Sequence, residues 1–111
     1  MKLSVHVVDC ANGVAATDVG VLLRAHADGG WRDVSSGTTG PDGLLALWKG
    51  SPIEPGVYQL LFDLDRYYAI LGTFSFYPRV IVEFRVSDPD ADLHLPLITT
   101  SNSYTAFRSD S

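Results

Sequence analysis

The chain has 111 residues, of which 46% are apolar and 19% charged, and this balance excludes an intrinsically disordered protein. Its 8 basic residues are scattered and outnumbered by 13 acidic ones, so we expect no nucleic-acid partner. No apolar run is long enough to cross a membrane, and the first residues have the pattern of a strand rather than of a secretory signal. The sequence therefore predicts a single cytoplasmic domain over residues 1–111, without a membrane partner.

Hydrophobicity alternates with period two along most of the chain, which is typical of strands with one buried face. In the first such segment Leu3 and Val5 fall on one face, whereas Ser4 and His6 fall on the other. Turn signals rich in glycine and proline separate the segments. In chain order, the predicted strands cover residues 3–9, 19–26, 31–38, 44–49, 57–62, 79–86, 93–98 and 103–108.

One short helix, over about residues 64–71, interrupts this pattern. Asp63 or Asp65 can cap its first turn by accepting hydrogen bonds from free N–H groups, and Gly72 ends it. Eight short strands and one helix predict an all-β sandwich. The apolar face of the helix would consist of Leu64, Tyr67, Tyr68 and Leu71.

Polar and special residues inside the strands give further expectations. Asp9 follows a strand and precedes a loop, so we expect it to cap a turn. Pro96 has no N–H group and therefore predicts a sheet edge or a bulge. Cys10, the single cysteine, cannot form an internal disulfide and is expected to be a small apolar filler.

The three histidines are too far apart in the sequence for a local metal motif, and His26 is expected on the surface. His6 and His94 each lie in mid-strand opposite a row of aliphatic residues, so both should project from the outer face of a sheet. They are either two solvated surface residues or, if they converge, a pair suited to acid–base chemistry. Periodicity leaves both interpretations open.

Several segments, in order along almost the whole chain, resemble the 5-hydroxyisourate hydrolases, the enzymatic relatives of transthyretin. The opening segment Leu3-Ser4-Val5-His6-Val7-Val8-Asp9 is similar to the opening motif of that family, and His94-Leu95-Pro96-Leu97 is similar to its His-Val-Pro-Leu segment. The segments between them are Gly37-Thr38-Thr39, Asp42-Gly43, Glu54-Pro55-Gly56 with Tyr58, Phe76-Tyr77-Pro78, Val82-Glu83-Phe84 and Asp88-Pro89-Asp90.

This resemblance implies a transthyretin-like sandwich of two four-stranded antiparallel sheets. It also implies a homotetramer, a dimer of dimers, in which the outer sheet faces line a channel that holds the active sites. Family members open the ring of 5-hydroxyisourate by attack of water, in urate breakdown, without a metal or cofactor. Exposed apolar residues agree with burial between subunits: Leu22, Ile81 and Ile98 lie on the predicted outer faces.

The resemblance can be carried over residue by residue. The two family histidines fall on His6 and His94, and the family arginine falls on Leu44. The family's C-terminal Tyr-Arg-Gly-Ser falls on Phe107-Arg108-Ser109-Asp110, so Arg108 alone is kept. The resemblance thus implies catalytic roles for His6, His94 and Arg108, and a substrate-binding surface formed by Leu44, Phe107, Ser109 and Asp110.

These departures favour a pocket that is more apolar and less suited to anions than that of the family. The first hypothesis is a divergent enzyme that uses the histidine pair to open, close or rearrange a small cyclic carbonyl-containing substrate, as a hydrolase or a cyclase. The second is hydrolysis of 5-hydroxyisourate itself. The third is a tetramer that binds a small molecule without catalysis, because fold does not fix function.

Overall fold

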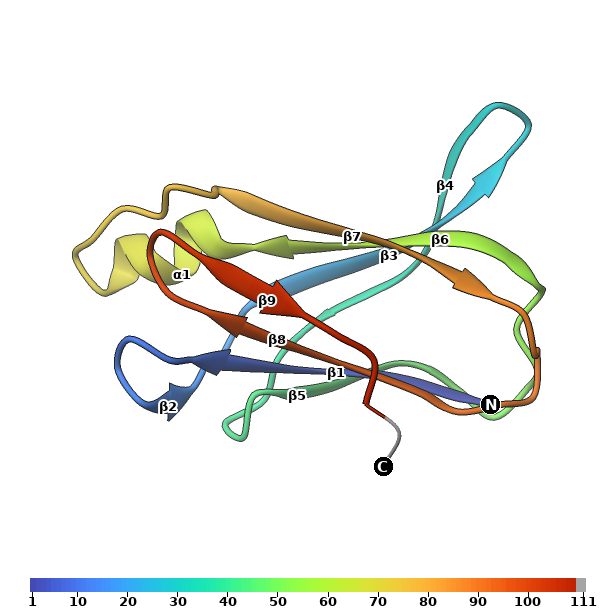
Figure 1. Cartoon of the computed structure of the whole chain (residues 1–111), viewed down its shortest axis with the longest axis horizontal. Helices are drawn as coiled ribbons and strands as arrows, with labels where there is room; N and C mark the ends of the chain where they lie inside the picture. Colours follow the sequence, from blue (N-terminus) through green and yellow to red (C-terminus); the bar gives the residue numbers. More distant parts are fainter. Residues whose placement is uncertain (110–111) are drawn as a thin grey trace.

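The computed structural model describes residues 1–109, whose strands form two sheets packed face to face (Figure 1). This confirms the predicted all-β sandwich with one short helix. The first sheet contains β1 (Lys2–Asp9), β2 (Val14–Ala15), β5 (Leu44–Lys49), β8 (Leu93–Thr99) and β9 (Tyr104–Ala106). The second sheet contains, in spatial order, β4 (Gly30–Thr38), β3 (Gly20–Ala27), β6 (Gly56–Asp63) and β7 (Arg79–Val86).

The core lies between the sheets and is built from the alternate residues that the period-two pattern singled out. Leu3, Val5 and Val7 of β1 have no exposed surface, and Leu23 and Leu60 meet them from the second sheet. Burying such aliphatic side chains stabilises the fold by roughly 1.5–3 kcal/mol each. Because every second residue of β1 is fixed inward, Ser4 and His6 must face outward.

The first sheet is mixed, whereas a wholly antiparallel sheet was expected. β1 pairs in parallel with β8 from Leu3 to Asp9 and antiparallel with its other neighbours. On the side of β1 that faces away from β8, β5 pairs with the first part of β1 and the two-residue β2 pairs with its last part. β2 was not predicted, since two residues are too few to show an alternating pattern.

The expectation of an edge or bulge at Pro96 was wrong. β8 lies inside the sheet, between β1 and β9, and its pairing with both neighbours shows no register shift. The pairing of β8 with β9 ends at Leu97. Pro96 therefore lies just beyond β9, where its missing N–H group interrupts no hydrogen bond between the two strands. One step further on, Phe107 N–H still donates to the Pro96 carbonyl at 3.3 Å, but proline has no N–H to return that hydrogen bond.

Helix α1 spans Leu64–Ile70 and lies at one end of the sandwich (Figure 1). Asp63 is its N-cap and accepts a hydrogen bond from Arg66 N–H at 3.4 Å, as predicted. Leu64 and Tyr68 are buried, but Leu71 is half exposed, contrary to the predicted apolar face, because the helix ends one residue earlier. Among residues 1–109, no helix is long and apolar enough to span a membrane.

Asp9 is fully buried where β1 ends, and it ties the following turn to the helix. Its carboxylate accepts hydrogen bonds from Asn12 N–H (3.1 Å), the Asn12 side-chain amide (2.7 Å) and the Tyr67 hydroxyl (2.7 Å). This confirms the predicted turn-capping role. Cys10, by contrast, is exposed rather than an apolar filler, because it follows the last inward position of β1 and points away from the core.

Acid should weaken the fold through Asp9. Burial raises the pKa of its carboxyl, but the hydrogen bonds from Asn12 and Tyr67 outweigh burial and leave the pKa below its ordinary value. A carboxyl whose folded-state pKa is lowered stabilises the fold above its unfolded pKa of about 3.9, and this contribution is lost as pH falls through the folded-state pKa. Urea unfolding should therefore show that the free energy of unfolding decreases less between pH 7 and pH 3 in Asp9→Asn than in the wild type. Asp33→Asn, at an exposed position, serves as the control. An equal decrease in the free energy of unfolding in all three proteins would contradict the prediction.

Candidate active site

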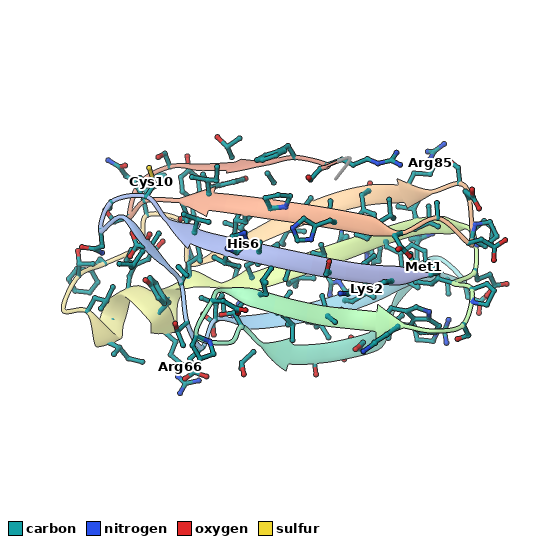
Figure 2. The ribbon with its side chains drawn as sticks, turned by 90° about the horizontal axis from the view of Figure 1, so that it is seen from below. Met1, Lys2, His6, Cys10, Arg66 and Arg85 are labelled. Carbon is teal, nitrogen blue, oxygen red and sulfur yellow. The ribbon has the colours of Figure 1, made fainter. Side chains whose placement is uncertain are left out.

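His6 and His94 project from adjacent strands onto the outer face of the first sheet; Figure 2 looks onto this face, with His6 midway along β1. In the parallel pairing of β1 and β8, Ser4 is the register partner of His94, and His6 is the partner of Pro96. The two imidazole centroids are 6.5 Å apart, with planes inclined by 29°. That separation is too long for a hydrogen bond between the rings.

Ser4 contacts His94 directly. The Ser4 Oγ lies 2.7 Å from the His94 Nδ1, and both residues are half buried. The backbone of His94 is held from its other side as well, since Ser109 N–H donates to its carbonyl at 2.9 Å. With Nδ1 engaged, Nε2 is the nitrogen of His94 that remains for a ligand.

The turn before β5 places Leu44 beside His6, because the two residues are register partners. Gly43 in this turn has a positive φ of 78°, and a Cβ there would lie 2.5 Å from the Val7 carbonyl oxygen, so only glycine fits. Val7 N–H donates to the Gly43 carbonyl at 2.9 Å, and Asp42 accepts a hydrogen bond from Leu44 N–H at 3.0 Å. Leu44 is 43% exposed on the outer face.

The chain beyond β9 runs back along β8 and brings the C-terminal candidates to the same face. Ser109 forms an isolated bridge with His94, and Arg108 lines the same groove as His94. Phe107 is 45% exposed and does not line that groove, although its N–H group is bonded to Pro96. The remaining candidate, Asp110, lies outside the described residues.

These elements enclose an open groove of about 800 Å³. His6 does not line the groove. It lies next to two residues that do, Leu44 and His94. The groove contains two carboxylates and two cations, since Asp42 and Asp92 contribute to it together with Lys2 and Arg108. Over residues 1–109, no three histidine, cysteine or carboxylate side chains gather as metal ligands do. The lining consists of Lys2, Ser4, Asp42, Leu44, Leu45, Ala46, Asp92, Leu93, His94, Arg108 and Ser109.

The structure thus brings five of the seven predicted site residues to one region of the sheet: His6, His94, Leu44, Arg108 and Ser109. Ser4 was not predicted as a site residue. The signal was present, because Ser4 is two residues from His6 and shares its face, but the contact with His94 depends on a pairing between strands about ninety residues apart.

Comparison with known proteins identifies the family of the chain. A family model described as the HIUase/Transthyretin family matches residues 3–109. The chain is 37% identical to the 5-hydroxyisourate hydrolase of Mus musculus over 109 residues, covering 96% of this chain and 92% of that protein. It is 34% identical to the 5-hydroxyisourate hydrolase of Salmonella dublin over 107 residues, covering 96% and 79%.

A solved structure has a similar fold. Sea bream transthyretin, determined in complex with thyroxine, superposes with a TM-score of 0.90 at 28% identity, covering 98% of this chain and 95% of that one. A match of this extent shows that the sandwich is transthyretin-like. The chain therefore belongs to the HIUase/transthyretin family.

Proposed function

We propose that the protein is an enzyme in which His6 and His94 perform acid–base chemistry on a small cyclic, carbonyl-containing substrate. The observation that carries the proposal is the pair of imidazoles, 6.5 Å apart on one outer face. In a ring opening, one imidazole would take a proton from water as the water attacks the carbonyl carbon, and the other would protonate the leaving atom as its bond to that carbon breaks. Ring closure or rearrangement needs the same two proton transfers in another order.

The groove supports a substrate that is less anionic than 5-hydroxyisourate. A guanidinium would offer an anion two parallel hydrogen bonds, whereas Leu44, beside His6, offers none. The carboxylates of Asp42 and Asp92 balance the charges of Lys2 and Arg108 in the same groove, so the groove offers an anion no excess of positive charge. The proposal includes no metal or cofactor, because the residues present supply the proton transfers alone.

Hydrolysis of 5-hydroxyisourate itself is the second candidate. It is supported by the identity of 34–37% to relatives with that name, over 96% of the chain. For this reaction another group would have to replace the missing arginine, and Arg108 is the candidate that lines the groove.

An assay on a panel of substrates tests these candidates. The panel contains freshly generated 5-hydroxyisourate and uncharged cyclic imides, lactams and lactones of similar size. We expect ring opening of 5-hydroxyisourate to be about 10²–10³-fold slower than by the mouse enzyme, because that is the typical effect of losing one such donor. An equal rate would overturn our first proposal in favour of the second. Tight binding of a ring without any turnover would favour the non-catalytic tetramer.

We further propose that the protein works as a homotetramer, a dimer of dimers. β7 pairs with β6 and β9 with β8, so over residues 1–109 their outer edges are open on the same side of the sandwich (Figure 1). A ring contact of 5.1 Å between Tyr77 and Tyr104 joins these edges, and Phe76 beside them is 74% exposed. Open strand edges with exposed aromatic residues favour pairing with a second copy.

Light scattering at micromolar concentration should therefore give four times the 12.0-kDa chain mass. Phe76→Asp should shift the protein to smaller species without unfolding it, since Phe76 is exposed in the single chain. The exposed Ile70→Asp, on the helix, provides a matched apolar-to-charged control away from the two edges. A wild-type monomer would remove the shared channel that the tetramer provides for the two histidines.

A further inference from the structure

We infer that Ser4 is a positioning residue for His94: its hydroxyl holds Nδ1 and thereby presents Nε2 to the substrate in either protonation state. This inference rests on the proposed acid–base function of His94. It adds a residue that the resemblance did not assign and that acts through His94 rather than on the substrate.

The geometry leaves the imidazole of His94 little freedom. Ser4 and His94 are register partners on two paired strands, so their Cβ atoms leave the same face side by side. The Oγ–Nδ1 distance of 2.7 Å is that of a good hydrogen bond. Ser109 N–H holds the His94 carbonyl from the opposite side at 2.9 Å. The backbone of His94 is therefore fixed from both neighbouring segments, and its ring is fixed by Ser4.

The chemistry of the partner then decides what Nε2 can do. A carboxylate or a carbonyl only accepts hydrogen bonds, so as a partner it keeps a proton on Nδ1 and leaves Nε2 as a base. A serine hydroxyl both donates and accepts. It accepts from Nδ1–H in the neutral tautomer with a bare Nε2 and in the imidazolium, and it donates to Nδ1 in the neutral tautomer that carries its proton on Nε2. Ser4 thus keeps the ring of His94 oriented as a base and, once Nε2 has gained a proton, as the imidazolium acid, and unlike a carboxylate it also permits the tautomer with a bare Nδ1.

Paired substitutions separate the hydroxyl from the volume of the side chain. Ser4→Thr keeps the hydroxyl on a residue that suits a strand, and Ser4→Val replaces that hydroxyl with a methyl group of similar size. We expect Ser4→Val to lower kcat by about 10–100-fold, the usual effect of losing a partner that orients a functional histidine, with KM within about twofold. Ser4→Thr should stay near the wild type. Ser36→Ala, an exposed serine on β4, is the matched control.

Nitrogen-15 NMR of the imidazole rings provides a readout independent of turnover. In Ser4→Val the ratio of the two neutral tautomers of His94 should change, while the signals of His26 on the other sheet should not. An unchanged His94 spectrum would overturn the inference, as would a changed spectrum with wild-type kcat in a protein that His94→Ala inactivates. If His94→Ala itself leaves turnover intact, the proposed function fails, and the tautomer ratio alone then decides whether Ser4 holds the ring.

Discussion

Replacing His6 or His94 with alanine is expected to lower kcat/KM by about 10²–10⁴-fold, the range typical of a lost general acid or base. The assay uses the fastest substrate of the panel. Both side chains are half buried on the outer face and neither belongs to the core, so the free energy of unfolding should change by less than about 1 kcal/mol. The double variant should be little slower than the slower single variant, because residues that act as a unit do not contribute additively.

The third histidine provides the control for this experiment. His26 is exposed on the second sheet and contacts Trp31 edge-on at 5.1 Å, far from the pair in the fold. His26→Ala should keep full turnover. If His6→Ala and His94→Ala unfold instead, the two histidines are structural; if they fold and keep turnover, the chemistry belongs to other groups.

Most of the fold could be predicted because alternation is a local signal. Inward and outward residues alternate along β1, and this alternation alone predicts that Leu3 faces the core and Ser4 faces outward. The N-cap at Asp63 was equally predictable, since it rests on the chemistry of a few adjacent residues. The local signals failed where a neighbouring strand decides the outcome, as at Pro96, which an internal strand accommodates because β9 ends beside it.

The site could be predicted less completely, because it depends on which strands are neighbours. Alternation places His6 and His94 on outer faces, but their approach follows from the parallel pairing of β1 with β8, between segments far apart in the chain. The family resemblance implied that both histidines belong to one site, but it implied antiparallel sheets and so did not supply that pairing. It did not supply the Ser4–His94 contact, which requires the register of the two strands to the residue.

An arginine in place of Leu44 is expected to change the substrate preference of the protein. We predict that Leu44→Arg raises kcat/KM for 5-hydroxyisourate by about 10²–10³-fold, the usual contribution of one well-placed donor to a developing anion. Turnover of uncharged rings should fall, since a guanidinium without an anionic partner is costly in a site from which a ligand excludes water. Stability should change by about 0.5 kcal/mol or less, because Leu44 is 43% exposed.

Two matched variants separate charge from geometry at this position. Leu44→Lys adds the same charge without the planar, two-pronged donor, so it should recover much less activity on 5-hydroxyisourate. Leu44→Met changes the shape of the side chain without charge and should leave both activities near those of the wild type. Adding Phe107→Tyr to Leu44→Arg returns the hydroxyl that the resemblance implies, and the two effects need not add if the side chains share one site.

Arg108 offers the competing explanation for an intact hydrolase. It lines the groove with His94, so it could bind the anionic substrate that Leu44 cannot. In that case Arg108→Ala would abolish turnover of 5-hydroxyisourate in the wild type, and Leu44→Arg would change little. If instead Leu44→Arg gains that activity and loses turnover of uncharged rings, the loss of the arginine is what redirected the histidine pair. Unchanged activity of Leu44→Arg on every ring would count directly against a remodelled pocket, because the side chain next to His6 would then have no influence on what the groove binds.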